Sequence, residues 1–410
     1  MPLVLHVLAL AVFAQGMSEF MLSGLLEDIA HDLGVSVATA GTLTSAFAVG
    51  MVVGAPTLAV VGRRWSPRRA LLLFLLAFLL AHVVGALTTD FPVLLGTRVV
   101  GALANAGFLA VAVSTAAGLV EPTAKGRATS ALLGGITLAC VVGVPCGALL
   151  GQLWGWRAAF WAVVLLSLPA LVAILRSVPD EPGGSQPGRD DGAPGGTRSL
   201  RGELRALRAP RVVVTLALGA LVNGGTFCTF TYLAPLVTEV TGFAEHRVPA
   251  LLALFGAGAF LGVAFGGRMA DTRPVRLLAT GGVALLVGWV LLALTAGNPV
   301  AACLLVFVQG VLAFGVGSTL VSQVLYAAPG APTLAGGFAT AAFNVGAAVG
   351  PLLGALALEG GLGYRSPLWV SALLVALALV SGTAAASLQR RSTPRGKGAP
   401  AAVGRAEPGR

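Results

Sequence analysis

The sequence predicts an all-α membrane protein with twelve transmembrane helices in two six-helix halves. Of its 410 residues, 56% are hydrophobic and only 10% are charged, and the mean hydropathy is +0.90, whereas soluble domains carry about 25% charged residues. Apolar runs of about 20 residues, each long enough to cross a bilayer as a helix, recur along the whole chain. A single long polar segment divides these runs into two groups of six.

The predicted spans are continuously apolar and rich in Leu and Ala, whereas the strands of a transmembrane barrel alternate in polarity. The first run lacks a basic n-region and an obvious small-residue cleavage site, so we expect it to remain as the first span rather than to be removed. The twelve spans are predicted near residues 5–26, 38–61, 70–88, 91–119, 128–151, 157–178, 211–238, 248–267, 277–296, 299–327, 333–358 and 367–388.

The lysines and arginines indicate the orientation of these spans. Of the 26, the odd-numbered connections hold only Arg157, Arg247 and Arg365, and Arg98 lies within span four; the others fall in even-numbered connections and the C-terminal tail. The positive-inside rule then predicts a multi-pass protein of the cell inner (plasma) membrane with both termini in the cytoplasm. The basic loops lack interleaved aromatic residues, so the net charge of +10 indicates lipid headgroups as partners and no nucleic acid.

The segment between the halves is rich in Gly, Pro and charged residues, which predicts a flexible cytoplasmic linker at 179–210. It separates an N-terminal bundle, 1–178, from a C-terminal bundle, 211–388, and residues 389–410 form a basic, disordered cytoplasmic tail. The stretch "GVPCGALLGQLWGWR" of span five has a counterpart in "GAAVGPLLGALALEGGLGYR" of span eleven. Paired repeats of this kind are typical of transporters whose substrate site lies near the midplane between the halves.

Glycines spaced four residues apart lie on one helix face, where they let neighbouring backbones approach closely. This spacing fits static packing, and it equally fits surfaces that slide during transport. The three series are Gly143, Gly147 and Gly151; Gly258, Gly262 and Gly266; and Gly346, Gly350 and Gly354.

Glu19 is a carboxylate set within an apolar span, and such charges usually face a cavity or a partner. It shares a predicted helix face with Gln15 and Ser23. Helical rise places Glu19 about 21 Å and Arg98 roughly 20 Å from the cytoplasmic face, with Asn105 nearer that face. We hypothesise that Glu19 binds the transported proton and that Arg98 modulates its charge. The alternative is a permanent Glu19–Arg98 ion pair that fixes two helices.

The candidate substrate contacts are polar or aromatic residues in the middle of spans, because a mostly apolar cavity with a few polar groups is the usual binding site. The spans hold one carboxylate, which favours neutral amphiphiles over multiply charged cations. We expect neither a cofactor nor a metal, since the four cysteines lie in spans without metal-site spacing, and no enzyme, because catalytic motifs are absent. The candidates are Gln15, Asn105, Asn223, Phe227, Tyr232, Gln309, Phe314, Gln323 and Asn344.

Three motifs resemble the major facilitator superfamily, specifically its twelve-span drug:proton antiporters. "GRMADTRPVR" after span eight is similar to the family's loop motif, "RVVGALANAG" resembles the span-four motif that begins with Arg98, and the glycines and proline of span five resemble the antiporter motif. The resemblance implies a monomer in which these motifs gate transport. The gating residues implied are Arg64, Arg68, Asp271, Arg273, Gly143, Pro145 and Gly147.

The sequence departs from the family pattern in the loop after span two, which keeps its arginines but lacks the usual acidic residue, and in Val144, where the antiporter motif usually has Gly. Asp271 is implied to form a latch, although an ordinary solvated charge is the alternative. "GMSEFMLSGLLEDIAHDLGVS" and "GGITLACVVGVPCGALLGQLWGWRAAFW" are similar to chloramphenicol-resistance efflux proteins of high-GC bacteria, which implies proton-coupled antibiotic export. The open alternatives are an exporter of sugars, nucleosides or other metabolites, and a receptor that does not transport.

Overall fold

The computed structural model describes residues 3–61, 65–118, 135–136, 138–178, 205–328 and 334–392, and the elements in this part of the chain are helical. The elements of the first half are α1 (Leu3–Phe20), the 3₁₀ turn η1 (Met21–Gly24), α2 (Leu26–Asp32), α3 (Val37–Val61), α4 (Pro67–Leu87), α5 (Phe91–Gly118), the π-helical turn η4 (Ala139–Gly143), α7 (Val144–Trp154) and α8 (Trp156–Ser177).

The second half repeats this pattern. Its elements are α10 (Pro210–Thr231), α11 (Leu233–Glu239), the 3₁₀ turn η5 (Glu245–Arg247), α12 (Val248–Thr272), α13 (Pro274–Thr295), α14 (Pro299–Ala327), α15 (Leu334–Glu359) and α16 (Ser366–Ser392). Most of the predicted linker, and the tail beyond Ser392, lie outside the described residues.

Within the described chain, eleven helices are long and apolar enough to cross a membrane, and the Ala139–Trp154 segment is a shorter apolar helix. This short helix occupies the described part of predicted span five. The all-α class with twelve spans is therefore confirmed, and the chain is a multi-pass membrane protein.

The starts of two spans are fixed by side-chain caps. Ser66 precedes Pro67, the first residue of α4, and its hydroxyl accepts a hydrogen bond from the Arg69 amide. The Asn298 side chain accepts from the amides of Val300 and Ala301 at 3.0 and 3.1 Å, at the start of α14. Such residues satisfy amides that the first helical turn leaves without a partner, so the polar ends of the spans stay at the membrane surface.

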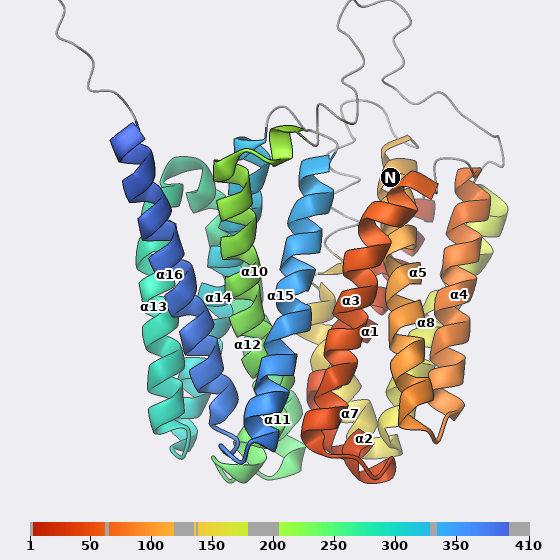
Figure 1. Ribbon diagram of the computed structural model, residues 1–410. Helices are drawn as coiled ribbons and strands as arrows, with labels where there is room; N and C mark the ends of the chain where they lie inside the picture. Colours follow the sequence, from red (N-terminus) through yellow and green to blue (C-terminus); the bar gives the residue numbers. More distant parts are fainter. Residues whose placement is uncertain are drawn as a thin grey trace, which may run out of the picture.

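The two halves lie side by side, with α3 of the first half packed against α15 of the second (Figure 1). A second seam forms where η4 and α7 pack against α12. The chain enters α1 and leaves α16 at the same end of the molecule, at the top of Figure 1, whereas α2 and α11 lie at the opposite end, called here the α2–α11 end.

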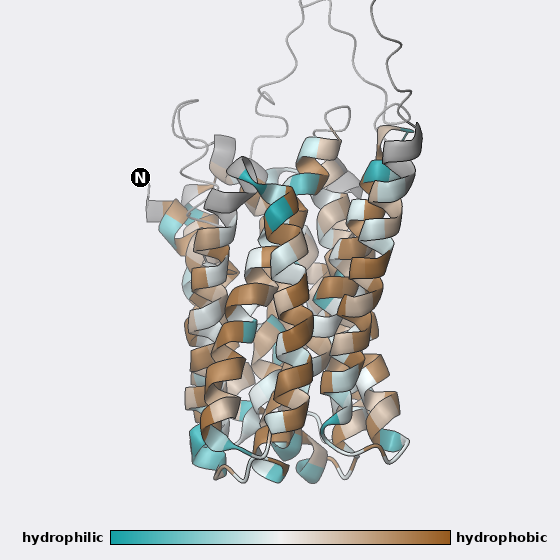
Figure 2. Cartoon of the chain, turned by 90° about the vertical axis from the view of Figure 1, so that its left-hand side faces the viewer, coloured by the Kyte–Doolittle hydropathy of each residue, from teal (hydrophilic) through white to brown (hydrophobic). Residues whose placement is uncertain are grey.

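Hydrophobic side chains cover the outer face of the bundle along most of its length, and hydrophilic residues gather at the two ends (Figure 2). On α4, Leu80 is 63% exposed and Leu87 is 66% exposed; on α13, Leu294 is 59% exposed. A water-soluble protein rarely presents so large an apolar surface, and a bilayer covers it without cost.

The glycine series pack within one half rather than across the seams. A Cβ at Gly143 or Gly147 would approach Met17 or Met21 of the first half, and the Gly258 series meets α14. Gly350 lies against the backbone of Gly224 in α10. The static-packing interpretation therefore fits these glycines, and contacts that slide between the halves do not explain them.

Span five contains the π-helical turn η4, which ends at Gly143, two residues before Pro145. Proline has no N–H to donate to the carbonyl four residues earlier, so the regular ladder is interrupted there. The turn lies on the seam, where a Cβ at Gly256 of α12 would collide with the backbone of Cys140 and Val141. The irregular backbone of one half therefore fits a bare backbone position of the other.

Asp32, at the end of α2, connects three parts of the first half. It forms an ion pair with Arg157 and accepts a hydrogen bond from Trp156 Nε1 at 3.1 Å. Arg157 also donates to the Thr88 carbonyl at 3.0 Å and lies over the Trp156 ring. The hydrogen bond from Arg157, followed by that from Trp156, lowers the pKa of the Asp32 carboxyl.

This pair predicts a pH-dependent contribution to stability. Because the folded-state pKa is lowered, the stabilisation is present above the unfolded pKa of about 4 and is lost as pH falls through the folded value. At pH 7 the free energy of unfolding of the wild type is expected to exceed that of Asp32→Asn by up to about 1 kcal/mol, because the pair is partly exposed. The wild type should therefore melt at a higher temperature. Tryptophan-fluorescence melts in detergent at pH 7, 5 and 3 measure this margin. A margin that does not shrink at pH 3 would contradict the assignment.

Candidate functional site

The predicted acid and base lie close together near the middle of the first half, but they do not form an ion pair. Arg98 is 2% exposed, and its guanidinium donates from Nη1 to Ser18 Oγ at 2.9 Å and from Nη2 to the Ser18 carbonyl at 2.7 Å. Glu19, the next residue of α1, is partly buried, and its carboxylate hydrogen-bonds to no described residue. Of the two interpretations of this pair, the permanent ion pair is absent from the described structure.

Two further side chains complete the surroundings of Arg98. His82 of α4, also 2% exposed, places Nε2 2.6 Å from Ser18 Oγ and Nδ1 2.7 Å from the Phe78 carbonyl. The Phe47 ring of α3 lies 4.5 Å from Arg98 Cζ, in a cation–π arrangement. The buried charge is therefore stabilised by neutral groups from several helices.

Polar residues of the first half that were predicted to contact substrate are buried in the same region. Gln15 is 1% exposed, and neither its amide nitrogen nor its amide oxygen has a hydrogen-bond partner among the described residues. Asn105 is 5% exposed, and its Nδ2 lies 3.6 Å from the Met51 sulfur, a weak acceptor. An unsatisfied buried amide costs free energy, so Gln15 has capacity to bind a polar group of a ligand.

In the second half, the predicted amides are engaged with the backbone. Asn223 Nδ2 donates to the Phe343 carbonyl at 2.7 Å, between α10 and α15, and Asn344 Nδ2 donates to Thr340 of its own helix at 3.0 Å. Their side-chain oxygens make no hydrogen bond that the described structure records. These two residues are close to the same α10–α15 packing surface, and their free acceptors remain available.

Phenylalanines connect the two halves across the centre. Phe20 of α1 lies 5.9 Å from Phe227 of α10, between ring centroids. Phe230 stacks on Phe255 at 4.9 Å, and the Phe255 ring is 6.1 Å from Phe314. Phe227 and Phe230 are themselves 6.3 Å apart, so the rings form one continuous aromatic series. Aromatic rings of this kind suit contact with an apolar or aromatic ligand.

Two predicted substrate contacts lie elsewhere. Gln309 is fully buried, donates to the Leu285 carbonyl at 3.1 Å and packs against Gly288, so it joins α14 to α13. Tyr232 is 1% exposed; its hydroxyl donates to the Pro351 carbonyl at 3.0 Å, with the Ala38 carbonyl at 3.4 Å. Tyr232 therefore lies on the seam at the α2–α11 end, where its ring packs against Gly41.

The halves also meet at this end through two other hydrogen bonds. Thr238 of α11 donates to the Glu27 carboxylate of α2 at 2.9 Å, and Gln152 of α7 donates to the Glu245 carbonyl. Gly24 packs against Ala148 and, across the seam, Leu252. The α2–α11 end is thus closed by small residues and neutral donors.

The residues implied in gating are only partly described. Arg64 and the side chain of Asp271 lie outside the described residues, so the latch stays a prediction. Arg68 donates to the Leu175 carbonyl at the end of α8, and Arg273 is exposed before α13. In span five, Gly143 is the last residue of the π-helical turn η4, and Pro145 and Gly147 follow it in α7.

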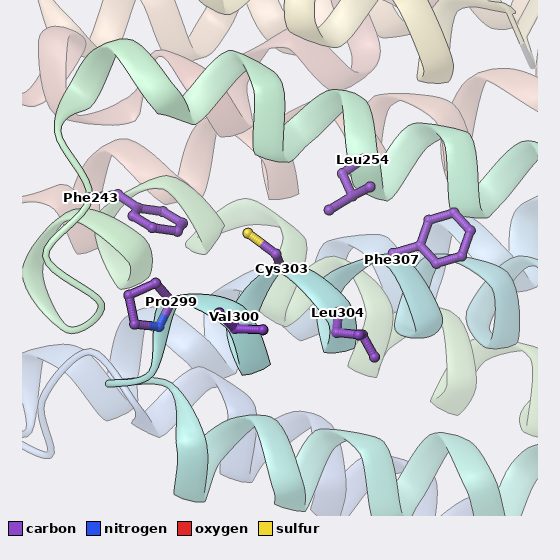
Figure 3. Close-up of a pocket in the computed structure, with 7 residues that line it drawn as sticks. All are labelled: Phe243, Leu254, Pro299, Val300, Cys303, Leu304 and Phe307. Carbon is purple, nitrogen blue, oxygen red and sulfur yellow. The ribbon is translucent and has the colours of Figure 1, made fainter.

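A separate pocket of about 480 Å³ opens between α12 and α14 near the α2–α11 end (Figure 3). Its lining is wholly apolar, and it includes none of the predicted site residues. Val300 and Leu304 at this pocket are 73% and 61% exposed on the outer surface of the bundle. Lipid chains would cover such a surface in a bilayer. The pocket is therefore separate from the central site, which comprises the residues around Gln15, Arg98 and Phe227.

Three side chains that hold Arg98 were not among the predicted site residues: Ser18, His82 and Phe47. His82 falls inside the predicted span 70–88, which contains no acid, lysine, arginine or other histidine. A histidine within an otherwise apolar span is itself a signal, because an intramembrane ionisable group usually has a partner.

Comparisons with known proteins agree with this fold. A sequence profile described as Major Facilitator Superfamily matches residues 8–331 and 250–408. The chain is 56% identical to a chloramphenicol resistance protein of Streptomyces lividans, over 93% of this chain and 95% of that protein. It is 32% identical to the inner membrane transport protein YdhP of Escherichia coli (strain K12), over 91% and 93%.

Solved structures give the same result for the fold alone. A crystal structure of a bacterial homologue of the human lysosomal transporter Spinster, in an inward-facing and occupied conformation, superposes with a TM-score of 0.75 at 18% identity, covering 95% of this chain and 98% of that one. The nucleoside transporter NupG superposes with a TM-score of 0.71 at 12% identity, covering 93% and 99%.

Proposed function

The chain belongs to the major facilitator superfamily and is a transporter rather than an enzyme, and on this premise we propose that it exports chloramphenicol or a related neutral, amphiphilic antibiotic in exchange for protons. The observation that carries the proposal is the 56% identity, over almost the full length of both chains, to a chloramphenicol resistance protein. The site adds the buried amide of Gln15, which has no hydrogen-bond partner among the described residues, and an aromatic series that links the halves; both suit a neutral ligand with polar groups.

The substrate would lie between the halves near Gln15, Asn105, Asn223, Phe227 and Asn344. In this proposal the α2–α11 end faces the cell exterior, and both termini face the cytoplasm, as the distribution of arginines indicates. The contacts of Tyr232 with Ala38 and of Thr238 with Glu27 close the exterior side, and their separation opens it. The protein would work as a monomer in the plasma membrane.

Glu19 is the proposed proton carrier, because it is a carboxylate at membrane depth without a hydrogen-bond partner among the described residues. Entry of one proton for each neutral substrate makes about 2.3 kcal/mol available per 100 mV of membrane potential, enough for a roughly fifty-fold substrate gradient. Arg98 supplies a fixed positive charge near that carboxylate. Proton coupling is thus sufficient to drive export.

Flux measurements in proteoliposomes with an imposed pH gradient test the proposal. We expect radiolabelled chloramphenicol to accumulate against its gradient, and to stop doing so when a protonophore collapses the pH difference. A cationic dye and a nucleoside serve as comparison substrates and are expected to move poorly. Faster movement of the nucleoside, or chloramphenicol flux that ignores the pH gradient, would contradict the proposal.

A further inference from the structure

His82 is buried between three helices and held in one orientation. Its ring lies 4.1 Å from the Phe78 ring and 5.7 Å from the Phe160 ring, between centroids. Nδ1 is 2.7 Å from the Phe78 carbonyl, and Nε2 is 2.6 Å from Ser18 Oγ. Both ring nitrogens therefore have a partner, one in the same helix and one in α1.

The hydrogen atoms of this cluster can be assigned from the donor inventory of each group. Arginine has only donors, so Ser18 Oγ accepts from Arg98 Nη1 and its own hydrogen is left for another acceptor. The Phe78 carbonyl can only accept, which places a hydrogen on His82 Nδ1 and, in the neutral imidazole, leaves a lone pair on Nε2. Ser18 therefore donates to His82 while accepting from Arg98, in one directed chain.

These hydrogen bonds hold the Arg98 guanidinium at Ser18. The second bond, from Nη2 to the Ser18 carbonyl at 2.7 Å, and the Phe47 ring beneath Cζ fix its remaining freedom. Glu19 is the next residue along α1, yet no ion pair between it and Arg98 is present in the described structure. Without the acceptor at His82 Nε2, the Ser18 hydroxyl is free to rotate toward another acceptor, so its oxygen no longer keeps a lone pair aimed at Arg98 Nη1.

We propose that His82 is a positioning residue for proton coupling: by fixing the Ser18 hydroxyl, it keeps Arg98 on Ser18 and away from Glu19, so that the carboxylate stays free to take up a proton. The inference rests on the proposed function, since it assigns Glu19 the coupling role. The other titratable groups that act on this cluster are Arg98 of α5 and Cys140 of η4. Phe47 and Phe160 are the uncharged neighbours contributed by α3 and α8.

The test is the pH profile of chloramphenicol transport in proteoliposomes. In His82→Leu, Arg98 is released to pair with Glu19, which favours the ionised carboxylate. Half-maximal transport should then move to a lower external pH by about one unit, and flux at pH 7 should fall about three-fold or more. In His82→Gln, the side-chain oxygen can replace Nε2 as acceptor, so most of the wild-type profile should return.

Serine substitutions supply matched variants. Ser18→Ala removes the same hydroxyl with little change in volume and should shift the profile in the same direction as His82→Leu. Ser167 of α8 is an equally buried serine, but its hydroxyl donates only to Val163 of its own helix, at 2.8 Å. Ser167→Ala should leave the pH profile where the wild type has it. Fluorescence melts of each purified variant report whether it is folded. If His82→Leu does not fold, the pH profile of Ser18→Ala alone tests the positioning role.

The possible outcomes separate the inference from the proposed function. Wild-type flux that does not respond to the pH gradient overturns proton-coupled export itself. A gradient-driven wild type together with unshifted profiles in His82→Leu and Ser18→Ala overturns the positioning role alone, as does a His82→Gln profile identical to that of His82→Leu. A merely structural role for His82 would reduce the maximal flux and leave the pH of half-maximal transport unchanged.

Discussion

Glu19→Gln is expected to abolish the uphill accumulation of substrate. The wild type can accumulate substrate up to roughly fifty-fold per 100 mV of membrane potential, and the variant should not accumulate it at all. Glutamine has nearly the same shape as glutamate but cannot carry a proton at this site. Because Glu19 hydrogen-bonds to no described residue, the substitution removes no hydrogen bond within the described part of the chain. Substrate binding and downhill exchange should therefore persist while coupling is lost.

Two measurements on the same vesicles distinguish these effects: alkalinisation or acidification of the lumen when substrate is added, and exchange of labelled for unlabelled substrate without a pH gradient. Asp90→Asn is the matched control, since Asp90 is an exposed carboxylate in the loop between α4 and α5. Accumulation in Glu19→Gln that still follows the pH gradient would exclude Glu19 as the proton carrier.

The second large effect is expected at Gly350, where α15 crosses α10. A Cβ there would collide with the carbonyl group of Gly224, and both groups belong to helix backbones that cannot rotate away. Gly350→Leu must force the two helices apart, which should cost about 3 kcal/mol or more, the upper part of the range for overpacking. The yield of monodisperse protein and its melting temperature should both fall sharply.

The same helix offers its own control. Gly336 also lies in α15, and a Cβ there would meet nothing within 4 Å. Gly336→Leu should therefore retain wild-type yield and melting temperature, although the change in residue type is identical. Equal losses at both positions would mean that leucine disturbs α15 itself rather than its contact with α10.

The twelve spans could be predicted from the sequence because each span depends on one local quantity, the number of consecutive apolar residues that a bilayer requires. The departures from regular helix were not predictable in this way. α1 ends at Phe20 and continues as a 3₁₀ turn, so Ser23 hydrogen-bonds back to the Phe20 carbonyl instead of extending the polar stripe of Gln15 and Glu19. The close approach of Gly24 to Ala148 and Leu252 accompanies this turn, and it depends on residues far apart in the sequence.

The site was predictable to about one helical turn. Depth estimates brought Arg98 level with Glu19, but helical rise over one residue is only about 1.5 Å and does not distinguish Glu19 from Ser18. The choice between them depends on His82 and Phe47, which come from two other helices. Likewise, Asn223 and Gln309 look alike in the sequence, and only packing shows that the Asn223 amide joins α10 to α15 whereas the Gln309 amide joins α14 to α13.

Across the closed α2–α11 end, acidic side chains face one another. Glu27 and Asp28 of α2 lie close enough to Glu245 for their charges to repel. Burial raises the pKa of Glu27 most, and the repulsion raises it further, whereas the hydrogen bond from Thr238 lowers it. No ion pair joins the two halves among the described residues. Dissolved ions screen repulsion as they screen attraction. Raising the ionic strength should therefore tighten this end, whereas a transporter locked by salt bridges would loosen.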